Sequence, residues 1–395
     1  MTRVWKRCRR WIKGSLQGPL SRLLLTGSVS HLEQEIDPDD LSHILVLRPD
    51  NRLGNLILMM PLLETLRYAA PRARITLVAG DRFSSILEGD PRVDEILNPE
   101  DGMRTLAALR RVSWDLALST PFPGATSFSG SLLLAWSHAR RRIGYDHPRS
   151  RSALTHSLPL PDEGLHAVRE LLDLSLLIRG CLPILKSPSL NLSVGEGPLM
   201  RSMDERIRQR AGHRRFLIHT GGRGLKGWSL PAFQELGKGL ASSGFDLWVA
   251  QGPDAPAWPE SGDRSYFTLP PMPIKEFGQT LAKVDRFIGC DSGVMHLSAA
   301  VGTPVTAIFR SSDPRRYAPI GADHQILILG SNSARHLDRG TWPSLPKELS
   351  PRLDQPSETL LNSEPEAQVA WALEKILDAV LETGSRPRHT EGAVR

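Results

Sequence analysis

The sequence predicts an α/β protein with two domains, each built on a parallel β-sheet that helices cover on both faces. The chain has 395 residues, more than one hydrophobic core usually organises. Short apolar runs typical of buried strands alternate with helical patterns and Gly- or Pro-containing turns, first over residues 43–118 and again over 216–309. Such alternation with short turns indicates parallel strands joined by crossover helices.

The first domain opens with a buried strand at 43–48, an apolar run that ends in Arg48. A turn at 49–55 leads into a helix over 56–70. The further expected elements are strands at 75–79, 93–97 and 115–118 and helices at 103–111 and 166–178. This order predicts a Rossmann-like domain.

The second domain repeats the plan. A strand at 216–219 ends in a Gly-rich basic loop at 220–228, and Pro231 begins a helix. The sequence further predicts a strand at 246–250, a helix at 274–283, a strand–helix–strand unit at 286–309 and a helix from Pro365 to Leu381. The expected limits are a basic segment and linker at 1–40, an N-terminal domain at 41–182, a linker at 183–198, a C-terminal domain at 199–340, and a Pro-rich segment, helix and disordered tail at 341–395.

The composition is that of a globular protein, with 23% charged residues and a formal net charge of +6. No apolar run reaches the roughly 18 residues that a membrane-spanning helix needs. Cys8, Cys181 and Cys290 show no metal-ligand spacing, which predicts reduced thiols in a cytosolic protein and no zinc site.

The basic excess lies in two places. Residues 1–13 contain only basic charges, and on a helix Trp5 and Trp11 would share the opposite face, as in a helix that lies in a membrane interface. A basic disordered tail is the alternative. The second cluster, at 140–142 with Arg149 and Arg151, fits either a solvated turn or a site that faces an acidic acceptor. Neither cluster is interleaved with aromatic residues in the manner of a nucleic-acid surface, so nucleic-acid binding is not expected.

The turn inside the 286–309 unit is the strongest indication of a ligand. Asp291, Ser292 and Gly293 join the strand to the helix. In open α/β sheets such a turn lies at the carboxyl edge, where the helix N-terminus offers unpaired N–H groups and a partial positive charge. A phosphate is the expected ligand. The alternative is an ordinary helix with Asp291 or Ser292 as its N-cap.

Four segments resemble the bacterial lipopolysaccharide heptosyltransferases of glycosyltransferase family 9: residues 48–63, 219–228, 252–254 and 291–309. The most specific is Asp-Ser-Gly-x-x-His-Leu-x-Ala-Ala-x-Gly-Thr-Pro, which begins at Asp291. The resemblance implies the GT-B fold, with two Rossmann-like domains that face a central cleft. It also implies inverting, metal-independent and cofactor-free transfer of a sugar from a nucleoside diphosphate, with ADP-heptose as the donor, to a lipid-linked saccharide. The expected location is the cytoplasmic face of the inner membrane.

By this resemblance, the donor is bound in the second domain. Lys226 matches a lysine that contacts the diphosphate and sugar, and its alternative is a solvated surface lysine. Asp254 matches an acid that binds the ribose hydroxyls, and its alternative is a turn residue. Asp291 matches a residue near the donor sugar, and its alternative is a helix cap. The remaining expected donor contacts are Thr220, Gly221, Gly222, Ser292, Gly293, Met295 and His296.

The first loop departs from the family pattern. The family carries Gly-Asp there, and that Asp is the expected general base, whereas this chain has Gly54 followed by Asn55. A neutral amide cannot take a proton, and base catalysis contributes about 10² to 10⁴ in rate. Three outcomes are open: Asp50 supplies the carboxylate from a loop one residue longer, Asn55 only orients the acceptor, or catalysis is weak. A turn residue is the alternative role of Asp50. Arg52 and Arg142 are the candidate acceptor contacts.

Three other functions compete with this interpretation. A membrane-associated nucleotide-binding protein without turnover would explain Asn55. A nucleotide-sugar epimerase of the same fold would need no lipid acceptor. A Rossmann oxidoreductase is disfavoured because no Gly-x-Gly-x-x-Gly follows the first strand.

Overall fold

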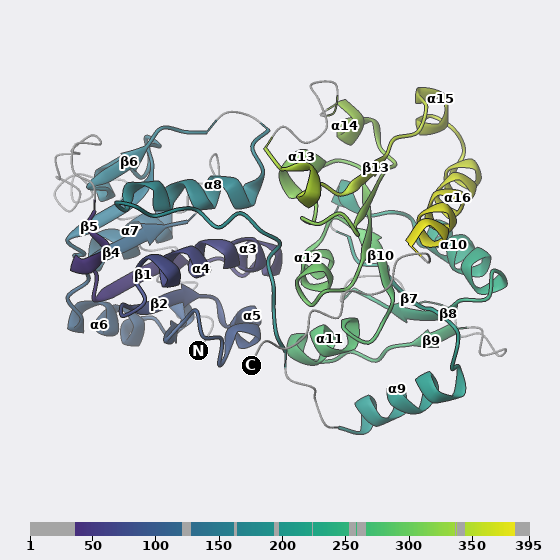
Figure 1. Cartoon of the computed structure of the whole chain (residues 1–395), viewed down its shortest axis with the longest axis horizontal. Helices are drawn as coiled ribbons and strands as arrows, with labels where there is room; N and C mark the ends of the chain where they lie inside the picture. Colours follow the sequence, from purple (N-terminus) through teal and green to yellow (C-terminus); the bar gives the residue numbers. More distant parts are fainter. Residues whose placement is uncertain are drawn as a thin grey trace. The chain divides into compact units, whose positions relative to one another are not determined.

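A computed structural model gives the structure of the chain and describes residues 36–120, 128–161, 164–192, 197–222, 224–252, 258, 266–335, 337 and 344–383. The chain forms two compact units, Met1–Pro188 and Ser189–Arg395. Each unit consists of one parallel sheet with helices packed on both faces (Figure 1). No helix of the described ranges is both long and apolar enough to span a bilayer.

The first unit contains a six-stranded sheet with the order β3-β2-β1-β4-β5-β6, in which every neighbouring pair is parallel. Its strands are β1 (His43–Arg48), β2 (Arg74–Ala79), β3 (Glu95–Leu97), β4 (Leu116–Ser119), β5 (Arg141–Tyr145) and β6 (His156–Leu158). Its helices are η1 (Pro38–Asp40), α3 (Leu53–Leu58), α4 (Met60–Ala69), α5 (Asp81–Ser84), η2 (Ser85–Leu87), η3 (Pro99–Asp101), α6 (Met103–Arg111), α7 (Phe128–Trp136), η4 (Arg151–Ala153), α8 (Ala167–Asp173) and η5 (Leu174–Leu177).

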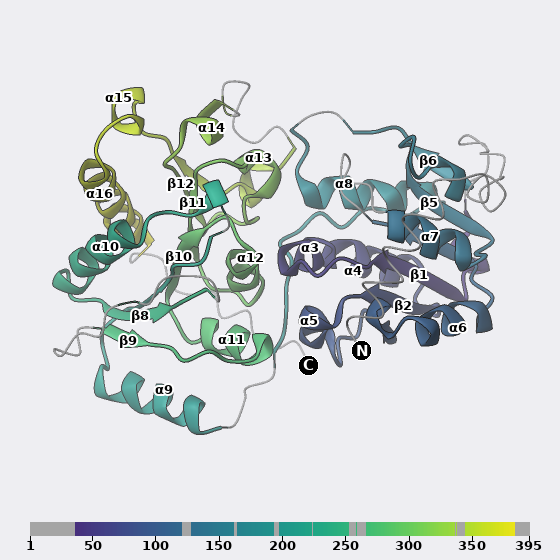
Figure 2. The same cartoon turned by 180° about the vertical axis from the view of Figure 1, so that it is seen from behind.

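The residues of β1 alternate between the two helical layers. Leu45 and Leu47 pack in a core with Leu109 of α6 and Leu134 of α7. The intervening residues are also fully buried, because the central strand of a parallel sheet is covered on both faces. Figure 2 shows the two layers from behind. This arrangement explains the uninterrupted apolar run that predicted the strand.

Two local expectations for the first unit need correction. The basic run at 140–142 is not simply a solvated turn, because Arg141 and Arg142 begin the interior strand β5 and only Arg140 lies in an exposed bend before it. The helix expected over 56–70 begins earlier, at Leu53, and is divided at Met59 into α3 and α4. Pro61, at the second position of α4, has no N–H to continue a single helix across this point.

The second unit contains a seven-stranded parallel sheet with the order β13-β12-β11-β10-β7-β8-β9. Its strands are β7 (Arg215–His219), β8 (Asp246–Ala250), β9 (Tyr266–Thr268), β10 (Arg286–Cys290), β11 (Val305–Phe309), β12 (Gln325–Ile328) and β13 (Arg352–Asp354). Its helices are α9 (Pro198–Gln209), η6 (Gly224–Lys226), α10 (Leu230–Ser242), α11 (Ile274–Leu281), α12 (Gly293–Ala300), α13 (Pro314–Tyr317), α14 (Ser331–Ala334), η8 (Lys347–Leu349), α15 (Glu358–Leu361) and α16 (Pro365–Thr383).

The C-terminal segment contributes to the core of this second unit. The helix α16 packs against α10, and its Ala372 and Ile376 join the core formed by Phe216 and Phe233. The edge strand β13 pairs with β12. The sequence predicted α16 but not β13, because a three-residue strand is too short to show an alternating pattern.

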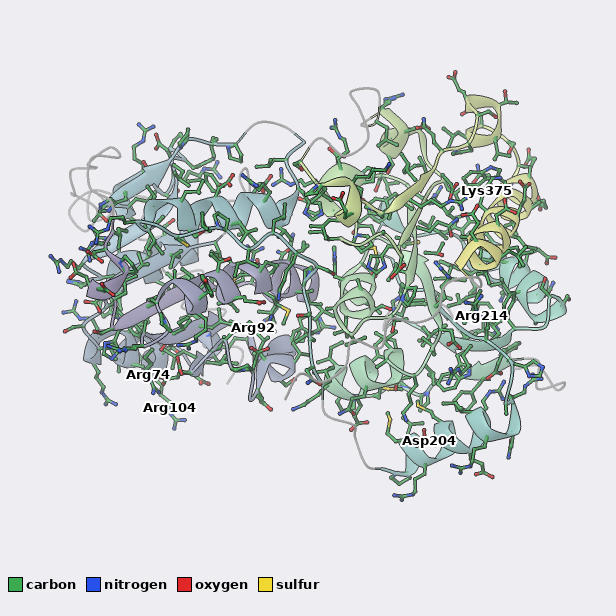
Figure 3. The ribbon with its side chains drawn as sticks, viewed as in Figure 1. Arg74, Arg92, Arg104, Asp204, Arg214 and Lys375 are labelled. Atoms are coloured by element: carbon green, nitrogen blue, oxygen red, sulfur yellow. The ribbon has the colours of Figure 1, made fainter. Side chains whose placement is uncertain are left out.

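Some charged side chains away from the carboxyl edges of the sheets lie in solvated surface pairs. Arg74 and Arg104 point away from the ribbon of the first unit (Figure 3). Arg74 lies 3.3 Å from Glu95 and remains half exposed. Such exposed ion pairs contribute little to stability. The basic excess of the chain is therefore not by itself a guide to the site.

Candidate functional site

Three loops meet at the carboxyl edge of the second sheet. They follow β7, β10 and β11, which are consecutive in the strand order. Because parallel neighbours end at the same edge, segments far apart in the sequence come together there, at the place where open α/β sheets bind ligands. The loops contain Lys226, Asp291 and Ser312 respectively.

Lys226 and Asp291 form an ion pair at this edge. The Lys226 Nζ binds Asp291 Oδ2, and the Ser312 Oγ donates a hydrogen bond to the same oxygen at 2.6 Å. The Asp291 side chain is 6% exposed, whereas that of Lys226 is 40% exposed. The Lys226 Nζ also lies 5.5 Å from the centroid of the Tyr317 ring, a cation–π distance. The cation is thus held in place but remains accessible to a ligand.

The first turn of α12 lies directly after this pair in the chain. Ser292 is its N-cap, and the Ser292 Oγ accepts a hydrogen bond from the N–H of Met295 at 3.3 Å. Within the described ranges, the N–H groups of Gly293 and Val294 have no protein acceptor. They are free N–H donors of a helix start, where the macrodipole favours an anion. The Met295 side chain is fully buried, so only its backbone could contact a ligand.

Glycines close the loop that carries Lys226. A Cβ added to Gly222 would lie 2.6 Å from the Gly227 Cα, and one added to Gly221 would lie 2.4 Å from the His219 Cε1. The Arg310 Nη1 donates to the Gly227 carbonyl at 2.6 Å and so ties the loop to the end of β11. The folded loop therefore leaves no room for a side chain at Gly221 or Gly222 unless its neighbours move.

Two buried histidines flank the loops. Burial lowers the pKa of His219 and that of His296 to about 4, and in His296 the Lys226 cation lowers it further while Asp291 opposes the shift. Both rings are therefore neutral at physiological pH. The His219 Nδ1 and the Thr220 Oγ1 are buried, and neither has a hydrogen-bond partner in the part of the chain that the structure describes. Asp254, the expected ribose contact, lies outside the described residues.

The loop after β1 in the first unit contains the candidate base. Arg48 is buried, its Nη1 donates to the Thr120 carbonyl, and its Nε lies 3.2 Å from Asp50 Oδ2. The Asn55 Nδ2 donates to the same Asp50 oxygen at 3.0 Å. The other oxygen, Oδ1, is shielded from solvent and has no hydrogen-bond partner among the described residues. Asp50 is thus oriented through one oxygen, and its carboxylate is the acid group of this loop that could take a proton.

The residue after Asp50, Asn51, also has a defined place. The Asn51 Nδ2 donates to Glu100 Oε1 at 2.7 Å. A Cβ added to Gly80 would lie 1.8 Å from the Asn51 Oδ1, so this side chain fills the space over Gly80. Arg52, at the N-cap of α3, is exposed.

Arg142 lies apart from this loop. Its Nε donates to the Ala153 carbonyl at 2.7 Å and its Nη1 to the Ala139 carbonyl at 2.9 Å, and burial lowers its pKa. It pairs in register with Ala117, which in turn pairs with Leu45, three residues before Arg48. With a strand rise of roughly 3.3 Å and a strand spacing of roughly 4.8 Å, the Cα atoms of Arg142 and Arg48 lie about 14 Å apart. Its two described side-chain hydrogen bonds are thus to backbone carbonyls of the first unit, and its part in acceptor binding stays a prediction.

Sequence reasoning missed Arg48, Arg310, Ser312 and Tyr317. Arg48 and Arg310 directly end or follow apolar strands, which places them at a carboxyl edge, and Ser312 follows two residues later. A polar residue at or just after the end of an apolar strand was the signal from which Arg48, Arg310 and Ser312 could have been predicted. No cluster of three or more His, Cys, Asp or Glu side chains suited to a metal ion occurs among the residues that the structure describes.

Comparison with known proteins relates this geometry to a family. The model of glycosyltransferase family 9 (heptosyltransferase) matches residues 103–342. No curated protein matches the chain.

Several solved structures are similar. A family 9 glycosyl transferase from Veillonella parvula DSM 2008 is 19% identical, with a TM-score of 0.64 over 89% of this chain and 98% of that chain. The E. coli ADP-heptose lps heptosyltransferase II is also 19% identical, with a TM-score of 0.64 over 87% and 100%. The E. coli heptosyltransferase WaaC with ADP is 16% identical, with a TM-score of 0.57 over 75% and 96%. At these identities the likeness concerns the fold, and it confirms the predicted pair of Rossmann-like domains of the GT-B class.

Proposed function

The chain belongs to glycosyltransferase family 9, the heptosyltransferase family, and on that premise we propose that it is an inverting glycosyltransferase. In this proposal it moves a heptose from a nucleoside-diphosphate donor to a lipid-linked saccharide of the lipopolysaccharide core or a related surface glycan. The observation that carries the proposal is the Lys226–Asp291 ion pair next to the free N–H groups of α12. An accessible cation and a helix N-terminus in one place suit a diphosphate.

The second unit would bind the donor. Lys226 and the first turn of α12 would hold the diphosphate, and Asp291 would lie near the transferred sugar. The Thr220 Oγ1 and His219 Nδ1, which have no hydrogen-bond partner among the described residues, offer two further polar atoms, and Asp254 would take the ribose hydroxyls. We propose ADP-heptose as the donor because similar E. coli structures contain ADP and an ADP-heptose analogue.

The first unit would bind the acceptor and supply the base. The acceptor hydroxyl oxygen attacks the anomeric carbon, the bond from that carbon to the phosphate oxygen breaks, and the hydroxyl proton passes to the Asp50 carboxylate, whose side chain is 38% exposed. Asn55 and Arg48 hold the opposite oxygen and orient the carboxylate. Lys226 offsets the negative charge that develops on the departing diphosphate, which is the largest electrostatic demand of such a step.

Residues 1–13, which lie outside the described ranges, would attach the protein to the cytoplasmic face of the inner membrane through their basic and tryptophan side chains. A lipid-linked acceptor is found at such a surface. Arg52, exposed at the start of α3, remains the proposed acceptor contact, whereas Arg142 is committed to backbone carbonyls.

A second candidate is a nucleotide-binding protein of the same fold without turnover. Asn55 is the observation that favours it, since the position expected to carry the base holds an amide. This candidate predicts nucleotide binding without consumption of any donor.

Donor turnover separates the two candidates. The purified full chain would be mixed with ADP-, UDP- and GDP-sugars and with extracted lipid-linked core acceptors, and product and free nucleotide would be measured. Asp50→Asn should lose about 10² to 10⁴ in rate with ADP binding intact, and Lys226→Ala should weaken ADP binding. Lys238→Ala, an exposed lysine on α10, is the matched control. ADP binding without transfer to any acceptor would favour the second candidate.

A further inference from the structure

One oxygen of Asp291 has two donors of different kinds. Oδ2 accepts from the Lys226 ammonium and from the Ser312 hydroxyl, the latter at 2.6 Å. Ser312 is itself anchored, because the Ser333 Oγ donates to the Ser312 carbonyl at 2.7 Å and Ser333 is fully buried. The Asp291 carboxylate therefore keeps one neutral, fixed partner whatever the lysine does.

We propose that Ser312 is a positioning residue that allows Lys226 to leave Asp291 and bind the diphosphate of the donor. The inference rests on the proposed function of this site. A diphosphate must compete with Asp291 for a single ammonium group. Withdrawing the only partner of a carboxylate that is 6% exposed would leave a buried charge without a hydrogen bond, which is costly. The Ser312 hydroxyl reduces that cost because its bond to Oδ2 persists.

The surrounding contacts restrict the movement to the lysine side chain. Arg310 holds the Gly227 carbonyl through a hydrogen bond, and Gly222 packs closely against Gly227, so two contacts hold the described ends of the loop. The Lys226 side chain is unbranched and 40% exposed, so it can turn without moving the loop. The Tyr317 ring, 5.5 Å from Nζ, offers the cation a second favourable contact beside Asp291. On ligand binding, the Lys226 ammonium would therefore exchange Asp291 for the diphosphate while the loop backbone stays in place.

The test is the affinity for ADP and for inorganic pyrophosphate, measured by calorimetry on the full chain. Ser312→Ala should weaken both about tenfold, the effect of one hydrogen bond to a charged group, because Lys226 then stays on Asp291. Ser312→Thr retains a hydroxyl and should remain within about twofold of wild type. Ser311→Ala is the matched control, since no hydrogen bond of the Ser311 side chain occurs among the described residues.

A double-mutant cycle distinguishes positioning from direct contact. In a Lys226→Met background, Ser312→Ala should leave the affinity for ADP and pyrophosphate unchanged, because there is no lysine to release. An equal loss in both backgrounds would mean that Ser312 contacts the ligand itself and would overturn the inference. Wild-type affinity in Ser312→Ala would overturn it as well.

A measurement without ligand separates this inference from the proposed function. The rate at which acetic anhydride acylates the Lys226 amine, followed by mass spectrometry, should fall severalfold in Ser312→Ala, while that of exposed Lys238 stays constant. If the wild-type protein bound neither ADP nor pyrophosphate, the proposed function would lose its donor. The acylation rate alone would then test whether Ser312 allows Lys226 to leave Asp291. An unchanged acylation rate in Ser312→Ala would refute this inference.

Discussion

Gly222→Ala should disable the proposed donor site while the rest of the second unit stays folded. The added Cβ would lie 2.6 Å from the Gly227 Cα and 3.1 Å from the Gly227 N. Carbon atoms in contact are ordinarily about 3.5 to 4.0 Å apart, so the backbone at Gly222 and the backbone at Gly227 must separate by roughly 1 Å. Neither contact atom belongs to a side chain that could rotate away. Because Gly227 directly follows Lys226, the ammonium would be displaced by a similar distance.

We expect a loss of about 1 to 3 kcal/mol in the free energy of unfolding from this overpacking. A displacement of about 1 Å at a reacting centre costs on the order of 10² in rate, so kcat/KM for the donor should fall by that factor. Chemical denaturation gives the first quantity and donor turnover the second. Both should be measured at a temperature where circular dichroism shows the variant to be folded.

Gly239→Ala is the matched control. Its Cβ would come as close, 2.5 Å, but to the terminal Cδ2 of Leu373, a flexible methyl in the contact between α10 and α16. Leu373 can turn aside, and alanine is the better helix former, so stability should change little. A folded Gly222→Ala protein with wild-type kcat/KM would refute the reasoning, since the loop would then tolerate the side chain without moving Lys226.

Two further predictions concern stability. Burial lowers the pKa of His219 and His296 to about 4 and that of His324 to about 3, from 6.5 in the unfolded chain. Protonation thus favours the unfolded chain, and the free energy of unfolding should fall as the pH drops from 6.5 towards 4, by about 1.4 kcal/mol per pH unit for each histidine; denaturation midpoints that do not change with pH would contradict this. Arg142→Met should cost about 2 kcal/mol through its two lost carbonyl hydrogen bonds, and ADP affinity reduced in the folded variant would show that Arg142 also acts on the site.

Much of the fold could be read from local patterns. Residues 44–47 and 247–250 are apolar because both strands are covered on two faces, and the observed limits of the strands, 43–48 and 246–250, agree with the prediction. The Ser292 cap and the first turn of α12 were likewise visible, since capping depends only on neighbours in the sequence. The three-residue strand β13 was not, because nothing in so short a run distinguishes a strand from a loop.

The site could be predicted only where one segment determines it. The sequence by itself identified the turn after β10 and the Gly-rich loop of Lys226, because a strand that ends in small and polar residues before a helix is a local signal. The tertiary structure decided which of these residues meet. Lys226 and Asp291 are 65 residues apart, and Ser312 reaches Asp291 from a third loop because β11, β10 and β7 are neighbours in the sheet. Strand order depends on the packing of the whole unit. For that reason the sequence did not show that Ser312 is the second partner of Asp291. It also did not show which partners bind the Asp50 carboxylate, or that Arg142 donates to two backbone carbonyls.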